Sequence, residues 1–148
     1  MASLLSLDLQ HLEVGRFEDD RITEDAPITF GPEDLSNPQP WIWLLEWLYR
    51  FRGYIDVTAF LLHRPEVVIL LFEVFHRVCN YFGARPQMVL EIYRDPESPE
   101  ADEQLFILIQ TTLPVPEAMA RLKDFDYEWW LGVPRQTRQH VVVDVEFV

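Results

Sequence analysis

The histidines and the cysteine are the side chains of this sequence best suited to bind a metal ion or act as a nucleophile. The four histidines are scattered over different predicted elements: His11, His63, His76 and His140. None has the His-x-x-x-His spacing that places two ligands on one helix face. The only cysteine, Cys79, lies in the apolar run Phe75–Phe82, where a buried and inert thiol is expected. The pattern predicts no metal ligand.

Acidic residues gather in two segments that offer carboxylates to calcium or magnesium. Glu18-Asp19-Asp20 lacks the alternating ligand spacing and the central glycine of a calcium loop. The segment 95–103 is closer to that alternation, but Pro96 and Pro99 interrupt it. Both segments are therefore interpreted as solvated acidic loops, and no cofactor is predicted.

Sequence motifs for catalysis are missing. The chain has no Gly-x-Ser-x-Gly elbow, no phosphate-binding glycine loop and no dinucleotide fingerprint. No catalytic residue is predicted on that basis. A small enzyme whose site assembles only in three dimensions stays as an alternative, and it would join a histidine with Glu91, Asp126 or Glu128 in a deep pocket.

Aromatic residues are dense between positions 41 and 54. A single helix cannot bury Trp41, Trp43, Trp47 and Phe51 along one stripe, so some of them must face a second surface. Tryptophan and arginine are enriched in binding hot spots. The candidate protein-binding residues are Trp43, Trp47, Arg50, Trp129 and Trp130, with the acidic residues Glu18, Asp19 and Asp20.

Composition indicates one folded, acidic domain. The chain has 148 residues, of which 49% are apolar, so residues 1–148 are predicted to form a single domain. The acidic segment 17–39 is expected to be a long loop. The net charge of −13 disfavours direct binding to nucleic acid and to anionic membranes. We see neither a signal peptide nor an apolar run long enough to span a bilayer, and therefore expect a cytoplasmic protein.

The hydrophobic periodicity predicts alternating strands and helices. Strands are expected at Ser3–Glu13, Gln87–Tyr93, Gln104–Thr111 and His140–Val148, and helices at Trp41–Arg52, Asp56–Leu62, Arg64–Phe82 and Pro116–Leu131. This order favours an α+β fold in which helices pack on one face of an antiparallel sheet. The β-α-β-β-α-β order is that of a ferredoxin-like sandwich.

Three stretches of the second half carry a resemblance. They are the strand and turn at 90–97, the apolar strand Leu105–Ile109, and the helix at 116–131 with its Phe125-Asp126-Tyr127-Glu128-Trp129-Trp130 end. Residues 86–132 thereby resemble a group of small uncharacterised bacterial proteins with a DPE hairpin turn and an FDEEWW-like helix end. Tyr127 stands where that group has an acid. The resemblance implies a bacterial origin and a shared fold, and it transfers no catalytic residue.

These patterns favour a non-enzymatic, acidic protein-binding module, such as an antitoxin-like inhibitor or an adaptor. An acidic chain steers association with a partner protein that has a basic surface. A homo-oligomeric structural subunit, for example a homodimer, is a further alternative, because the strand Val141–Val148 would pair with its twin if it lay at a sheet edge.

Overall fold

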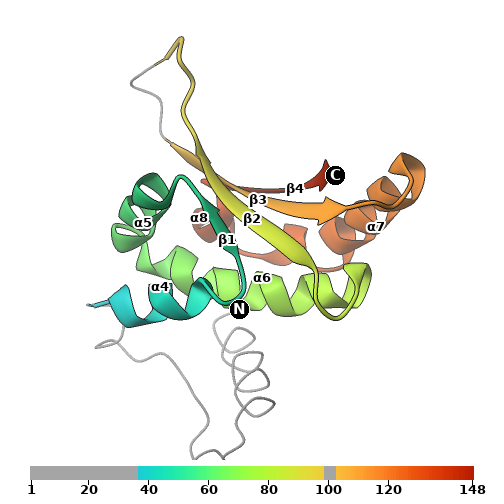
Figure 1. Ribbon diagram of the computed structural model, residues 1–148, viewed down its shortest axis with the longest axis horizontal. Helices are drawn as coiled ribbons and strands as arrows, with labels where there is room; N and C mark the ends of the chain where they lie inside the picture. The colour runs from blue at the N-terminus through green and yellow to red at the C-terminus, as the bar shows by residue number, and fades with distance from the viewer. Residues whose placement is uncertain (1–36, 99–102) are drawn as a thin grey trace, which may run out of the picture.

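The computed structural model describes residues 37–98 and 103–148, which form a mixed α+β arrangement (Figure 1). In chain order its elements are α4 (Gln39–Leu45), β1 (Arg50–Arg52), α5 (Tyr54–Leu62), α6 (Pro65–Phe82), β2 (Gln87–Tyr93), β3 (Gln104–Thr111), α7 (Val115–Glu128), the 3₁₀ turn η1 (Trp130–Gly132), α8 (Arg135–Arg138) and β4 (Val141–Phe147). The expected strand Ser3–Glu13 lies outside the described residues, as does the expected loop 17–39 up to position 36.

Helix α6 forms the floor of the hydrophobic core below the sheet (Figure 1). Pro65 begins the helix in its first turn, and Gly83, with a φ of 106°, follows its last residue. The apolar residues recur at helical spacing, and Leu70, Leu71, Val74 and Val78 are fully buried. The predicted helix Arg64–Phe82 is therefore confirmed apart from its first residue.

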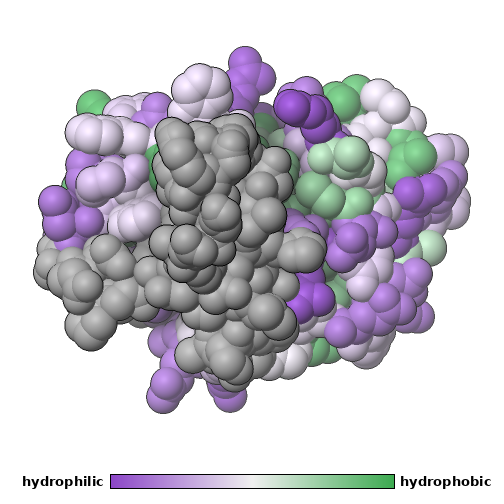
Figure 2. All heavy atoms as spheres, turned by 90° about the horizontal axis from the view of Figure 1, so that it is seen from below, coloured by the Kyte–Doolittle hydropathy of each residue, from purple (hydrophilic) through white to green (hydrophobic). Residues whose placement is uncertain are grey.

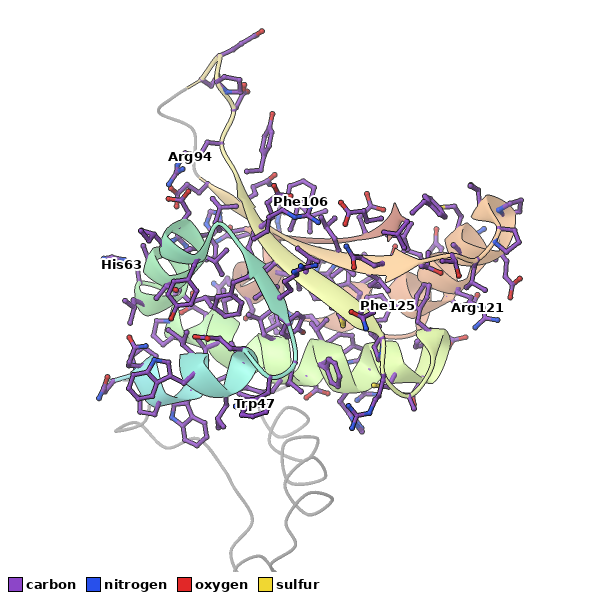
Figure 3. The ribbon with its side chains drawn as sticks, in the orientation of Figure 1. Trp47, His63, Arg94, Phe106, Arg121 and Phe125 are labelled. Carbon is purple, nitrogen blue, oxygen red and sulfur yellow. The ribbon has the colours of Figure 1, made fainter. Side chains whose placement is uncertain are left out.

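Strands β2 and β3 form the predicted antiparallel hairpin, with the bounds read from the sequence. Leu105, Ile107 and Ile109 point into the core and are fully buried. Phe106, which alternates with them, lies on the opposite face of the sheet (Figure 3). One face of the hairpin is thus buried under helices, while among the described residues no helix covers the other (Figure 1).

The sheet is mixed, so the predicted antiparallel ferredoxin-like arrangement is wrong. The strand order is β1-β2-β3-β4, with β1 parallel to β2, β2 antiparallel to β3, and β3 parallel to β4. Helices α5 and α6 connect the first parallel pair, and α7, η1 and α8 connect the second. Each helical crossover is long enough to bring the next strand alongside in parallel. The described chain is therefore two β-α-β units joined by a hairpin.

The expected helix Trp41–Arg52 is also corrected. Helix α4 ends at Leu45, and residues 50–52 form the edge strand β1. Breaking the helix allows Tyr49 to turn into the core, where its hydroxyl donates to the Leu71 carbonyl at 2.6 Å. Gly53, with a φ of 80°, provides the left-handed turn between β1 and α5 instead of ending a helix.

Strand β4 lies at the other edge of the described sheet. The Leu105 amide donates to the His140 carbonyl, and the Val148 amide donates to the Thr111 carbonyl. In this parallel register, the amide groups of Val145 and of alternate residues point away from β3. The Val145 N–H donates instead to the Asp144 carboxylate at 2.8 Å. Asp144 therefore occupies an outward amide and places a negative charge on the edge, which opposes pairing with another strand.

We expect Asp144→Ala to increase self-association, because it frees an outward amide and removes the charge beside it. Light scattering over a range of protein concentrations should show a higher average mass for Asp144→Ala than for the native chain. Asp124→Ala, which removes a charge from an exposed position on α7, is the control. Equal masses for the two variants would contradict a protective role of Asp144.

Candidate functional site

Two of the predicted binding tryptophans are exposed on one side of the molecule. The exposed fraction is 57% for Trp43 on α4 and 87% for Trp47 in the turn that follows. Ile42 and Leu45 are fully buried, so α4 turns its other side, with Trp43, to the solvent. Figure 3 shows Trp47 below the helices, on the side away from the sheet. Glu18, Asp19 and Asp20 lie outside the described residues.

Side chains at the start of α5 are also exposed. Ile55 is 80% exposed and Tyr54 is 48% exposed. The Tyr54 hydroxyl donates to Glu46 at 2.9 Å, which ties the start of α5 to the turn after α4 and raises the pKa of Tyr54. Trp43, Leu44, Trp47, Tyr54 and Ile55 are named here the α4–α5 surface. Figure 2 views the molecule from the side on which α4 and α6 lie.

A groove of about 670 Å³ adjoins Trp47. Its apolar lining includes Leu48, Phe75 and Met88, which come from the α4–β1 turn, from α6 and from β2. The predicted residues Trp47 and Arg50 line it together, and Arg85, from the loop between α6 and β2, joins them. Arg85 was not singled out from the sequence, because nothing local marks a residue 35 positions after Arg50 as its neighbour.

The two groove arginines differ from most others in the described chain. Four arginines form ion pairs with carboxylates: Arg52, Arg77, Arg94 and Arg121. Arg50 and Arg85 are exposed, and within residues 37–98 and 103–148 neither has an ion-pair partner. Glu46 also lines the groove, but its carboxylate accepts the Tyr54 hydrogen bond. The groove therefore presents available guanidinium groups beside an exposed indole.

The structure places Trp129 and Trp130 in the core, so they do not contribute to an exposed surface. Each is 7% exposed. The Phe125 ring lies 5.6 Å from Trp129 and 6.2 Å from Trp130, and Arg77 lies over the Trp129 ring. Helix α7 ends at Glu128, and the turn η1 folds both indoles inward. The predicted helix through Leu131 was therefore too long.

Replacing a tryptophan by alanine should affect stability differently in the core and on the α4–α5 surface. Trp130→Ala removes a large core side chain, and we expect it to lower the free energy of unfolding by about 3–5 kcal/mol. Trp47→Ala removes an exposed one and should change that free energy by less than about 0.5 kcal/mol. Chemical denaturation followed by circular dichroism measures both. Comparable losses would show that Trp47 packs against the core.

The uncovered face of the sheet carries a charged network that the sequence did not reveal. Arg52 on β1 donates to both carboxylate oxygens of Glu146 on β4, at 2.9 and 3.0 Å, and to Glu91 on β2 at 3.2 Å. Gln110 on β3 donates to the same Glu146 carboxylate. The Arg52 and Gln110 hydrogen bonds lower the pKa of Glu146 to about 2. The network thus links all four strands, and the Glu146 carboxylate at its centre stays ionised near neutral pH.

The depressed pKa of Glu146 predicts a specific pH dependence of stability. The pKa is about 2 in the folded chain and 4.5 ordinarily, so the stabilisation is complete above about pH 4.5 and is lost as the pH falls toward 2. At neutral pH, Glu146→Gln should be less stable than the native chain by about 1 kcal/mol or less, because the pair is partly exposed. The difference should shrink below pH 4.5.

Unfolding free energies measured at a series of pH values check this. Glu66→Gln is the control, since Glu66 is exposed and has no ion-pair partner among the described residues. A difference between Glu146→Gln and the native chain that stayed constant down to pH 2 would show that the network does not set this pKa.

The residues named for a three-dimensional enzyme site do not meet in the groove. Its lining contains no histidine and none of Glu91, Asp126 and Glu128. Glu91 is bound to Arg52, and Glu128 accepts a hydrogen bond from the Tyr81 hydroxyl. Burial, and then the nearby Asp144, raise the pKa of Asp126. Within the described ranges, no three histidine, cysteine or acidic side chains lie close enough to hold a metal ion.

Cys79 does not have the surroundings of an activated nucleophile. It is partly buried, its thiol lies 3.6 Å from the Ala84 carbonyl, and burial raises its pKa. A raised pKa lowers the thiolate fraction and therefore the reactivity of the group.

Comparison of the chain with protein-family models, with curated proteins and with solved structures gave no match. Within the described part of the chain, no helix is long and apolar enough to cross a membrane. The candidate site is therefore defined by its geometry alone: the α4–α5 surface and the adjoining groove.

Proposed function

We propose that this chain is a non-enzymatic protein-binding module that contacts its partner through the α4–α5 surface. The observation that carries the proposal is the exposure of two tryptophans four positions apart, with Trp47 at 87% and Trp43 at 57%. Exposed clusters of large apolar side chains mark interaction sites on soluble proteins. Tryptophan is also the residue type most enriched among hot spots.

Hydrogen bonds hold the backbone of the turn that carries Trp47. The Trp47 amide donates to the Leu44 carbonyl, and the Tyr49 amide donates to the Leu45 carbonyl. The buried hydroxyl of Tyr49 anchors the end of that turn to α6. A prearranged surface loses little conformational entropy on binding, which favours affinity.

The charge of the chain supports a partner protein with a basic surface. At −13, the chain attracts a basic partner over long distances and repels nucleic acid. An antitoxin-like inhibitor or an adaptor in the cytoplasm fits this combination of an acidic chain and an apolar contact surface. In this proposal the charge raises the rate of encounter, and the tryptophans stabilise the complex.

Affinity capture from the lysate of the protein's own host tests the proposal. The native chain should retain one stoichiometric partner, and the double variant Trp43→Ala/Trp47→Ala should lose it. The control is Tyr127→Ala, which truncates a 70% exposed aromatic residue on α7, outside the α4–α5 surface. Repeating the capture at about 0.5 M salt, which screens charges, shows how much of the binding to the partner is electrostatic.

If the double variant Trp43→Ala/Trp47→Ala and the control Tyr127→Ala retained the partner equally, the α4–α5 surface would not be the contact. A partner retained by the native chain at high salt, but lost by the double variant, would support the aromatic contact and limit the role of charge. Thermal unfolding of each variant ensures that a loss of binding is not a loss of folding.

A further inference from the structure

We propose that the groove beside Trp47 binds a short acidic segment of the partner protein that carries an aromatic side chain. This inference rests on the proposed function and names the chemistry of the segment that enters the groove. It is carried by two features of the lining: the arginines Arg50 and Arg85, and the apolar side chains that line the groove with them.

Charge supports an acidic occupant at this place. Arg50 and Arg85 exceed the one groove carboxylate, Glu46, so the lining has a positive balance in a chain of net charge −13. Neither arginine is bound to a carboxylate in the described part of the chain. Guanidinium groups pair with carboxylates through two parallel hydrogen bonds, which makes carboxylates their best complement.

The volume and the apolar part of the lining support an aromatic side chain beside the carboxylates. A volume of about 670 Å³ lies in the range of sites that hold small ligands or a few residues. The half-buried Phe75 offers an apolar contact, and the exposed Trp47 indole provides a surface for stacking. A polar acidic segment without an aromatic residue would leave these contacts unused.

A short acidic peptide fits the groove better than a nucleic acid does, although both are anionic. A nucleic acid extends its charge far beyond the groove and meets the repulsion of the whole acidic chain. A peptide with a few carboxylates feels mainly the charges within about 8–10 Å, because physiological salt screens the rest. The positive balance of the groove therefore favours a short acidic peptide over a nucleic acid.

Fluorescence anisotropy with defined probes tests the inference on the full chain. The first probe is a labelled Asp-Asp-Phe-Asp-Asp peptide with blocked ends, and its matched control replaces each aspartate by asparagine. Because the chain as a whole repels anions, saturable binding of the acidic probe reports a local positive site. We expect the control peptide to bind at least about fivefold more weakly, because it loses the ion pairs to both arginines and each exposed pair changes the affinity by up to about fivefold.

Arginine variants test whether the acidic probe binds in the groove. Arg50→Ala and Arg85→Ala should each weaken binding of the acidic probe about fivefold. The double variant Arg50→Glu/Arg85→Glu should abolish it. Arg135→Glu, an exposed charge reversal on α8, outside the groove, should leave it unchanged. Equal binding of both peptides, no binding of either, or an equal loss in Arg135→Glu would overturn the inference.

Two further outcomes would identify a different occupant and overturn the assignment. Tighter, arginine-dependent binding of single-stranded oligothymidylate would point to nucleic acid. Tighter binding of the acidic probe by Glu18→Gln/Asp19→Asn/Asp20→Asn would show that an acidic segment of the chain itself competes for the groove.

The capture experiment keeps the two proposals apart. If the peptide fails to bind while Trp43→Ala/Trp47→Ala still loses the captured partner, the groove chemistry is wrong and the proposed function stands. If the peptide binds in an arginine-dependent manner while capture is indifferent to the tryptophans, the groove binds acidic segments and the α4–α5 surface is not the contact.

Discussion

The pairing of β2 with β3 above α6 is the interaction on which the described fold depends. The register sets Leu90 opposite Ile107 and Met88 opposite Ile109, and all four side chains are buried. A shift by one residue would turn these side chains to the uncovered face and bring Phe106 inward, so the register is strongly determined. Strands β1 and β4 add to the outer sides of this hairpin, and their positions follow from it.

The candidate surface is a consequence of how the chain passes from α4 into β1, ahead of the first crossover. To place β1 beside β2, the chain must leave α4, turn, and enter the sheet within a few residues. Tyr49 enters the core at this turn, while Trp43 and Trp47 remain outside. The same turn brings Arg50 next to the loop after α6, where Arg85 lies. The topology thus assembles the groove from two segments that are far apart in sequence.

Sequence patterns predicted the elements whose information is local. The alternation along Gln104–Thr111 and the helical spacing of residues 65–82 are continuous and give the same structure in the fold. Strand β1 was missed because residues 50–52 follow an apolar helical segment and are too few to show a period of two. The parallel pairing of β1 with β2, and of β4 with β3, depends on long-range contacts, which no local pattern contains.

The candidate site follows the same division. The surplus of tryptophan between positions 41 and 54 correctly indicated that some indoles cannot enter the core, and Trp43 and Trp47 are exposed. The sequence predicted that the helix continues through Leu131 and that Trp129 and Trp130 bind a partner. Both tryptophans are buried instead, because the helix ends at Glu128 and a 3₁₀ turn changes the direction of the side chains that follow. Arg85 and the Arg52–Glu146 pair required the tertiary structure, since their neighbours come from remote segments.

The Arg52–Glu146 contact also bears on the order in which the chain folds. It joins residues 94 positions apart on the two edge strands, whereas the β2–β3 hairpin brings near neighbours together. Local contacts close with a smaller loss of entropy and tend to form first. The bridge between the edges can form only after both crossovers are complete, so it belongs to the last stage of folding. Interactions absent from the transition state slow unfolding and leave the folding rate nearly unchanged. A contact that forms this late contributes to the barrier to unfolding, and its share is small because the pair is partly exposed.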